Sequence, residues 1–197
     1  MTEGQPIGHC KRTCWIGTNI GLRLGLEGRR LHDLYYALLL KDVGCTSNAA
    51  RICQLFLSDD IHFKRDLLMT DDASMPQAVR FLLTHTAIGQ DLSDRLKSLF
   101  HVAVNKTKIN RDLIETRCTR GADIARQMRF DDDVAEGILH LDERWDGSGN
   151  PRGLRGDDIL LEARIVAVAD AVEAMLSPRP QRSPLSLGSC IEELHSQ

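Results

Sequence analysis

The sequence predicts an all-α fold, a single bundle of packed helices, and three observations support this. Apolar side chains recur at helical spacing along most of the 197 residues. No segment alternates apolar and polar residues as a half-buried strand would, and no internal repeat is visible. Hydrophobic residues make up 42% of the chain and charged residues 27%, which is ordinary for a globular domain that buries its own core.

The N-terminal third predicts three helices. Apolar residues from Trp15 to Leu24 follow an i, i+4 pattern, and Gly25 provides a stop. A second helix is expected over 29–41, where the step to Gly44 interrupts the pattern. A third, shorter helix is expected over 49–57.

The rest of the chain predicts further helices around one loop. The additional helices are expected over 77–86, 92–104, 111–128, 131–142, 159–176 and 186–194. Asp131 to Asp133 place negative charge at the start of one of them, where the helix dipole favours it. Residues 145–151 contain two glycines and a proline preceded by asparagine, so they must form a loop.

The charge balance and the apolar segments exclude several classes of protein. A net charge of −3 and a pI of about 6.2 give no general attraction for nucleic acid. The first twenty residues lack the apolar core of a signal peptide, and four charged residues interrupt the most apolar segment, 159–176. The six cysteines are irregularly spaced, which favours reduced thiols. We therefore expect a cytoplasmic protein without a membrane span.

A few polar residues stand out as candidate site residues. Asp170 lies within an otherwise apolar helix, and a buried carboxylate must be paired, hydrogen-bonded or metal-bound. Asp42 closes the 29–41 helix, and His9 precedes the first one. Simple structural roles remain open for each: a helix cap or arginine pair for Asp170, and surface positions for Asp42 and His9. Cys10 and Cys14 share a helix face, which favours packing over zinc binding.

Several segments together resemble the HD-GYP family of metal-dependent phosphohydrolases. The strongest match is the run ERWDGSGNPRGLRG over 143–156, with Gly149, Asn150 and Pro151 as the loop similar to the family's Gly-Tyr-Pro. It continues through LEARIVAVAD, which ends at Asp170. Weaker matches cover 9–12, 37–45, 117–122 and 179–182. The resemblance implies an HD-domain-like helical bundle.

The resemblance also implies a domain organisation. Residues 1–197 would form a single domain that is incomplete at its C-terminus, because the family pattern continues further. The segment between Asp42 and Cys118 is longer than the family places there, so we expect residues 46–110 to form a helical insertion beside the site.

The family binds two or three metal ions and hydrolyses cyclic di-GMP, and the resemblance places its ligand positions on this chain. His9, Asp42 and Asp170 match ligand positions, and Asp142 could serve as a fourth ligand. The positions at which this chain departs from the family are Gln5, Lys41, Cys45, Cys118 and Leu141. Leucine cannot bind a metal, and a lysine ammonium repels one, so we expect Lys41 to lie between Asp42 and Asp170 in place of a metal.

These departures predict a non-catalytic regulatory module that acts through protein contacts or nucleotide binding. Neither catalytic residues nor a cofactor are expected, or at most one weakly bound Mn, Fe or Zn ion. The partner would be a signalling protein or an attached domain, with a cyclic dinucleotide or a homodimer as further options. One alternative is a phosphodiesterase with a reduced metal site. Another is a soft-metal or redox site built from Cys10, Cys45 and Cys118 with His9.

Overall fold

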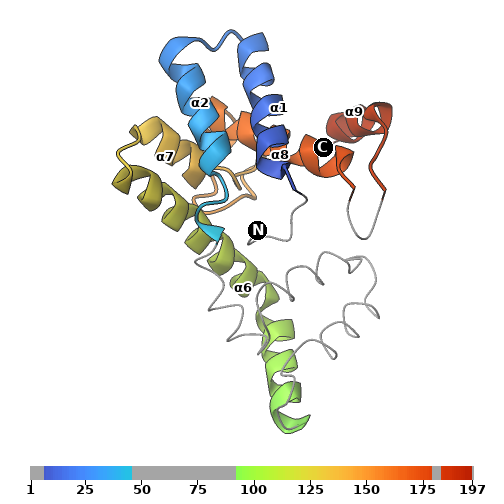
Figure 1. Ribbon diagram of the computed structural model, residues 1–197. Coiled ribbons are helices and arrows are strands. Elements are labelled where there is room, and N and C mark those ends of the chain that lie inside the picture. The colour runs from blue at the N-terminus through green and yellow to red at the C-terminus, as the bar shows by residue number, and fades with distance from the viewer. Residues whose placement is uncertain (1–6, 46–91, 179–182, 197) are drawn as a thin grey trace.

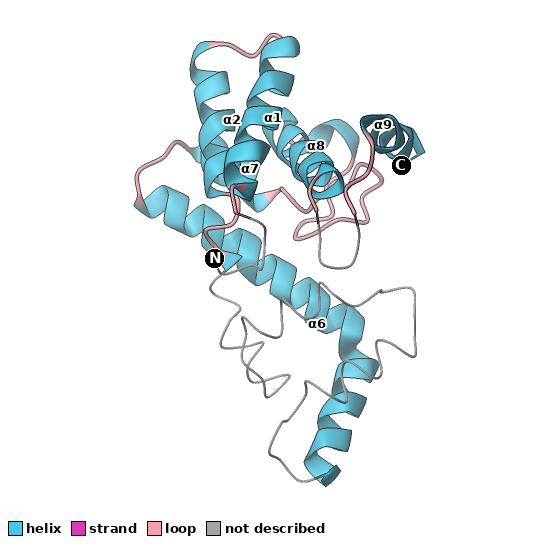
Figure 2. Ribbon diagram, turned by 45° about the vertical axis from the view of Figure 1, so that its right-hand side comes forward, coloured by secondary structure: helices cyan, strands magenta, loops and turns pink. Residues whose placement is uncertain are grey.

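The computed structural model describes residues 7–45, 92–178 and 183–196. Within these ranges the chain forms helices and loops and no strand, as Figure 2 shows. The predicted all-α class is therefore confirmed. The helices are α1 (His9–Arg23), α2 (Gly28–Leu40), α6 (Leu92–Gln127), α7 (Asp132–Leu139), α8 (Leu161–Leu176) and α9 (Leu187–Ser196), with a 3-10 turn η2 (Gly156–Asp158).

Helix α8 is the central element of the bundle. It packs against α1, α2, α7 and α9, while α1 and α2 lie side by side as a helical hairpin (Figure 1). The C-terminal half of α6 packs against α7, and its N-terminal half extends away from the bundle. Because α8 is apolar on more than one face, it can bury surface against several neighbours at once.

The core is a stripe of apolar side chains from each of these helices. Leu34 and Leu38 of α2 and Val134 and Ile138 of α7 are almost fully buried, one helical turn apart in each helix. Helix α1 approaches closely through Gly17, where an added Cβ would lie 2.6 Å from the Leu38 side chain. Each buried leucine contributes on the order of 1.5–3 kcal/mol, so this packing fixes the positions of α1, α2 and α8.

Several predicted helix boundaries are wrong. Two separate helices were expected over 92–104 and 111–128, but α6 is continuous, because no glycine or proline lies between them to interrupt its hydrogen bonds. Helix α1 begins at His9 instead of Trp15, and α7 ends at Leu139, where the chain turns. The helices expected over 49–57 and 77–86 lie outside the described residues, as does most of the proposed 46–110 insertion.

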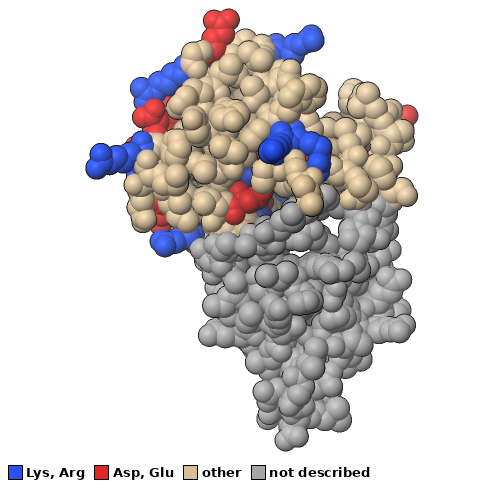
Figure 3. All heavy atoms as spheres, in the orientation of Figure 1, with Lys and Arg blue, Asp and Glu red and all other residues tan. Residues whose placement is uncertain are grey.

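Charged side chains of both signs are interspersed over the described part of the face in Figure 3. No single-sign surface of the kind that attracts nucleic acid is visible on that face. Among the described helices, none combines the length and the apolar character that a bilayer crossing requires.

Candidate active site

Three helices bring predicted site residues to one point. His9 lies in the first turn of α1, Lys41 and Asp42 follow the last turn of α2, and Asp170 lies in the middle of α8. These helices pack pairwise against one another. Residues distant in sequence therefore meet in one cluster, which we call the Lys41 cluster: His9, Lys41, Asp42 and Asp170.

The ammonium group of Lys41 lies at the centre of this cluster. Its Nζ is 2.6 Å from Asp42 Oδ2, 2.9 Å from Asp170 Oδ1 and 2.9 Å from His9 Nε2. His9 Nε2 is 3.3 Å from Asp170 Oδ1 and 3.8 Å from Asp42 Oδ2. Lys41 is 3% exposed and His9 is 4% exposed, whereas Asp170 is 43% exposed. The expected position of Lys41 between the two aspartates is present in the structure.

The charges of the cluster stabilise one another. Burial alone would raise the pKa of Asp170, but the contact with His9 and the charge of Lys41 lower it to about 2. Burial would lower the pKa of Lys41, but Asp170 and Asp42 raise it above its ordinary value. Burial also lowers the pKa of His9, and its contacts with Asp170 and Glu173 outweigh this and raise it. Lys41 and Asp170 therefore form a charged pair at neutral pH.

A second layer of polar groups supports His9. Glu173 lies one turn after Asp170 on α8 and is 1% exposed, with Oε2 2.5 Å from His9 Nδ1. Its other oxygen, Oε1, accepts hydrogen bonds from Arg12 and from Ser177. Sequence reasoning missed this role, although a glutamate at i+3 from Asp170 in an apolar helix was a usable signal.

Asp142 and Cys118 form a separate cluster with Arg117. Asp142 follows α7 and forms an ion pair with Arg117 of α6, and the Cys118 thiol lies 3.2 Å from Asp142 Oδ2. Burial raises the pKa of the Cys118 thiol well above its ordinary value, and the charge of Asp142 adds to this shift. The Arg117 guanidinium stays charged, because Asp142 outweighs the effect of burial and raises the pKa of Arg117.

The loop that resembles Gly-Tyr-Pro is held next to Asp142. The backbone N–H of Asn150 donates to the carbonyl of Asp142 at 3.1 Å. The buried carboxylate of Glu143 accepts hydrogen bonds from the backbone N–H groups of Arg152 and Leu154, at 2.6 and 2.9 Å. Gly149 lies against the backbone of Glu143 and Arg144, and an added Cβ would lie 2.2 Å from the Arg144 nitrogen. Only glycine therefore fits at this position. Glu143 and Asp142 thus determine where this loop lies.

The remaining predicted site positions have different environments. Leu141 is partly buried and packs against the hydrophobic core, and Cys45 is buried. Gln5 lies outside the described residues. The hydrogen bonds and ion pairs described above place His9, Asp42 and Asp170 in the Lys41 cluster, and Cys118 and Asp142 in a second cluster with Arg117. The convergence of these two clusters on one pocket stays a prediction.

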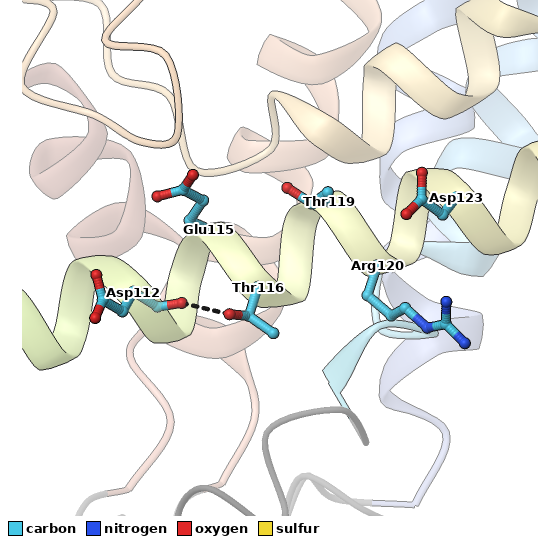
Figure 4. Close-up of a pocket in the computed structure, with 6 residues that line it drawn as sticks. All are labelled: Asp112, Glu115, Thr116, Thr119, Arg120 and Asp123. Carbon is cyan, nitrogen blue, oxygen red and sulfur yellow. Dashed lines mark hydrogen bonds between the residues drawn. The ribbon is translucent and has the colours of Figure 1, made fainter.

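A shallow depression also runs along α6 (Figure 4). Its residues lie in two rows on the helix: Asp112, Glu115, Thr116, Thr119, Arg120 and Asp123. The hydroxyl of Thr116 donates to the carbonyl of Asp112 at 2.7 Å, which is a bond within the helix itself. All six residues come from one helix, so among the described residues the depression is a polar helix face without groups converging from other elements.

Within the part of the chain that the structure describes, Cys10, Cys45, Cys118 and His9 form no group arranged to hold a metal ion, and a redox role for these cysteines stays a prediction. Burial raises the pKa of both Cys10 and Cys14, so both favour the thiol over the thiolate that binds metals. Cys10 Sγ lies 3.7 Å from Asp42 Oδ2, next to a carboxylate that further disfavours the thiolate.

The Lys41 cluster contains the types of donor that bind a divalent cation, but a cation already lies among them. One imidazole and two carboxylates surround Lys41 Nζ, and they are ordinary ligands for Mn, Fe or Zn. Within the described ranges, no group of three or more His, Cys, Asp and Glu residues is arranged to hold a metal ion. As arranged here, these residues do not fit a metal, because Lys41 fills the space among them.

Comparison with known proteins identifies the relatives of the chain. A family model described as HD domain matches residues 69–197. The chain is 46% identical over 173 residues to the 3′3′-cGAMP-specific phosphodiesterase 3 of Vibrio cholerae, covering 88% of this chain and 37% of that protein. It is 28% identical over 188 residues to the cyclic di-GMP phosphodiesterase of Thermotoga maritima, covering 95% of this chain and 39% of that protein.

A solved structure shows the same fold. The crystal structure of a cyclic GMP-AMP specific phosphodiesterase from V. cholerae matches with a TM-score of 0.66 and 34% sequence identity, over 100% of this chain and 41% of that one. The chain therefore spans roughly two fifths of the length of these relatives. The predicted HD-domain-like bundle is confirmed, while the narrower HD-GYP assignment stays a prediction.

These similarities correct three expectations. The non-catalytic module and the absence of enzymatic activity are contradicted, since a relative 46% identical over most of this chain is a phosphodiesterase. The expectation of no cofactor is contradicted as well, because phosphodiesterases of the matched family are metal-dependent. The sequence argument inferred lost activity from replaced ligands, and the similarity to phosphodiesterases overturns that inference.

Proposed function

Because the chain belongs to the HD domain family, we propose that it acts in a phosphodiesterase that hydrolyses cyclic dinucleotides, with 3′3′-cGAMP and cyclic di-GMP as candidate substrates. The observation that carries the proposal is the 46% identity over 88% of the chain to a cGAMP-specific phosphodiesterase. The Lys41 cluster is the proposed site, since His9, Asp42 and Asp170 converge there from three helices.

The polar groups of the site are suited to holding a phosphodiester in place. Lys41 keeps its positive charge, because Asp170 and Asp42 raise its pKa. Fixed cations beside a bound phosphodiester stabilise the negative charge that increases during its cleavage. Asp170 is the most exposed member of the Lys41 cluster, so it is the carboxylate most accessible to a ligand.

Hydrolysis by the whole chain tests this proposal. We expect conversion of 3′3′-cGAMP or cyclic di-GMP to its linear dinucleotide with Mn²⁺ or Fe²⁺ supplied, followed by chromatography of the products. Asp170→Ala should lower the rate about a hundredfold or more, because it removes a charged group of the proposed site. The matched control is Asp157→Ala, since Asp157 is 90% exposed and pairs only with Arg164 in the described residues. Absence of hydrolysis of both nucleotides, or equal rates for the two variants, would contradict the proposal.

Metal binding should depend on Lys41, because its ammonium and a metal ion cannot occupy the same space. Lys41→His replaces a charge that repels metal by a ligand, so we expect Mn²⁺ to bind at least about tenfold more tightly than to the unaltered chain. Electron paramagnetic resonance of free Mn²⁺ measures this without any activity. Lys11→His, which adds a histidine at an exposed position of α1, is the control. An equal increase in Mn²⁺ affinity in both variants would show that the added histidine binds metal nonspecifically.

The remaining expectations stay predictions. They are a cytoplasmic location, a signalling protein or attached domain as partner, and a homodimer. The domain limits of 1–197 and the insertion over 46–110 are also untested by the described residues.

A further inference from the structure

We propose that Glu173 is a positioning residue for the site: its buried carboxylate orients the His9 ring and selects the tautomer protonated at Nδ1, so that Nε2 presents a lone pair to Lys41. This role is distinct from metal binding or substrate contact, because Glu173 contacts His9 at Nδ1, whereas Lys41 contacts the other ring nitrogen, Nε2.

The carboxylate of Glu173 is itself held in one orientation. Its Oε1 accepts from Arg12 Nε at 2.8 Å, from Arg12 Nη2 at 2.6 Å and from the Ser177 hydroxyl at 2.6 Å. The remaining oxygen, Oε2, lies 2.5 Å from His9 Nδ1. An ionised carboxylate only accepts hydrogen bonds, and the Arg12 guanidinium and the Ser177 hydroxyl donate three of them to Glu173, which favours its ionised form. Nδ1 must therefore carry the proton.

The contacts of the other ring nitrogen of His9, Nε2, indicate the same tautomer. An ammonium group only donates hydrogen bonds, and Lys41 Nζ lies 2.9 Å from His9 Nε2, so Nε2 must accept. A proton on Nε2 could be donated to Asp170 Oδ1 at 3.3 Å, but it would face the closer ammonium group. The shorter contact, made by a full positive charge, decides in favour of the Nδ1–H tautomer.

Glu173→Gln should reverse this tautomer with little change in volume. The oxygen of the new amide would stay with Arg12 and Ser177, because these groups donate hydrogen bonds. The NH₂ group would then face His9 Nδ1 and donate to it. His9 would carry its proton on Nε2, directed at Lys41, and the contact between His9 and Lys41 would be lost. Glu173→Asp keeps the carboxylate and should keep the original tautomer.

Nitrogen-15 NMR of the imidazole rings tests the inference directly. The seven histidines are separated by comparison with His9→Asn, at alkaline pH, because the pKa of His9 is raised above its ordinary value of 6.5 and the ring must be neutral. We expect the Nδ1–H tautomer in the unaltered chain and the Nε2–H tautomer in Glu173→Gln. The matched control is Glu162→Gln, a second buried glutamate of α8, which pairs with Arg30 and leaves His9 untouched.

Two results of the NMR experiment would overturn the proposed role of Glu173. An Nε2–H tautomer in the unaltered chain would overturn the inference even if Glu173→Gln fails to fold. A folded Glu173→Gln with an unchanged His9 tautomer would overturn it too. The effect on catalysis rests on the proposed function: kcat should fall about 10–100-fold in Glu173→Gln, recover in part in Glu173→Asp, and leave KM nearly unchanged. If the chain hydrolyses neither nucleotide, the proposed function fails while the tautomer result still decides the role of Glu173.

Discussion

Lys41→Ala is expected to lower the free energy of unfolding by about 3 kcal/mol, the low end of the range for removing one partner of a buried ion pair. The substitution leaves Asp42, Asp170 and His9 around an empty position, and like charges then face each other without a cation. The loss stays at the low end because Asp170 is 43% exposed and water can solvate it. Urea unfolding followed by circular dichroism measures the change.

Two further variants show whether the loss of the Lys41 charge causes the destabilisation. Lys41→Met keeps most of the buried side-chain volume and should still destabilise the protein, because the carboxylates remain unpaired. Lys11→Ala, at an exposed position of α1, should change stability by no more than about 0.5 kcal/mol. A loss below about 1 kcal/mol in Lys41→Ala would mean that Lys41 contributes little to the fold.

Gly44→Ala is expected to destabilise the protein at least as much as Lys41→Ala. An added Cβ at Gly44 would lie 2.1 Å from the carbonyl oxygen of Arg117 and 2.6 Å from the backbone nitrogen of Gly121. Both atoms belong to the backbone of α6, so no side chain can rotate away, and the segment after α2 must move. Overpacking typically costs about 1–3 kcal/mol, and a backbone collision places this variant at the top of that range or above it. Thermal unfolding measures the loss.

The control for this variant is Gly188→Ala in α9. Its nearest neighbour to an added Cβ is the Ser186 hydroxyl at 3.8 Å, an ordinary contact, and alanine favours a helix over glycine by up to about 1 kcal/mol. Gly188→Ala should therefore be neutral or stabilising. If Gly44→Ala unfolds at the same temperature as the unaltered chain, the close approach of this segment to α6 is not required.

Most helices could be predicted because periodicity is a local property of the sequence. The spacing of apolar residues identified α2 and α8 within about two residues of their observed ends. The same reasoning divided α6 in two, since a polar stretch interrupts its apolar pattern although nothing in it interrupts backbone hydrogen bonding. The start of α1 was also missed, because its first turn carries His9, Cys10 and Arg12 in place of apolar residues.

The candidate site could be predicted only in part. Asp170 was identifiable from burial, because a carboxylate in an apolar helix requires a partner, and the resemblance supplied Lys41 and Asp42. The importance of Glu173 and Arg117 could not be inferred in this way, since their partners lie on other elements of the fold. The inference of lost activity failed because it compared residue types one position at a time, without the relatives that share this sequence.

The sequence by itself determined the helical class of the protein and the presence of a carboxylate in its central helix, because both follow from residues that are neighbours along the chain. Only the tertiary structure decided which groups meet. The packing of α1, α2 and α8 brings Lys41 among His9, Asp42 and Asp170, and it places Glu173 behind His9. Distances between such side chains depend on how the helices cross, and this is set by the fit of many apolar contacts distributed over the whole core.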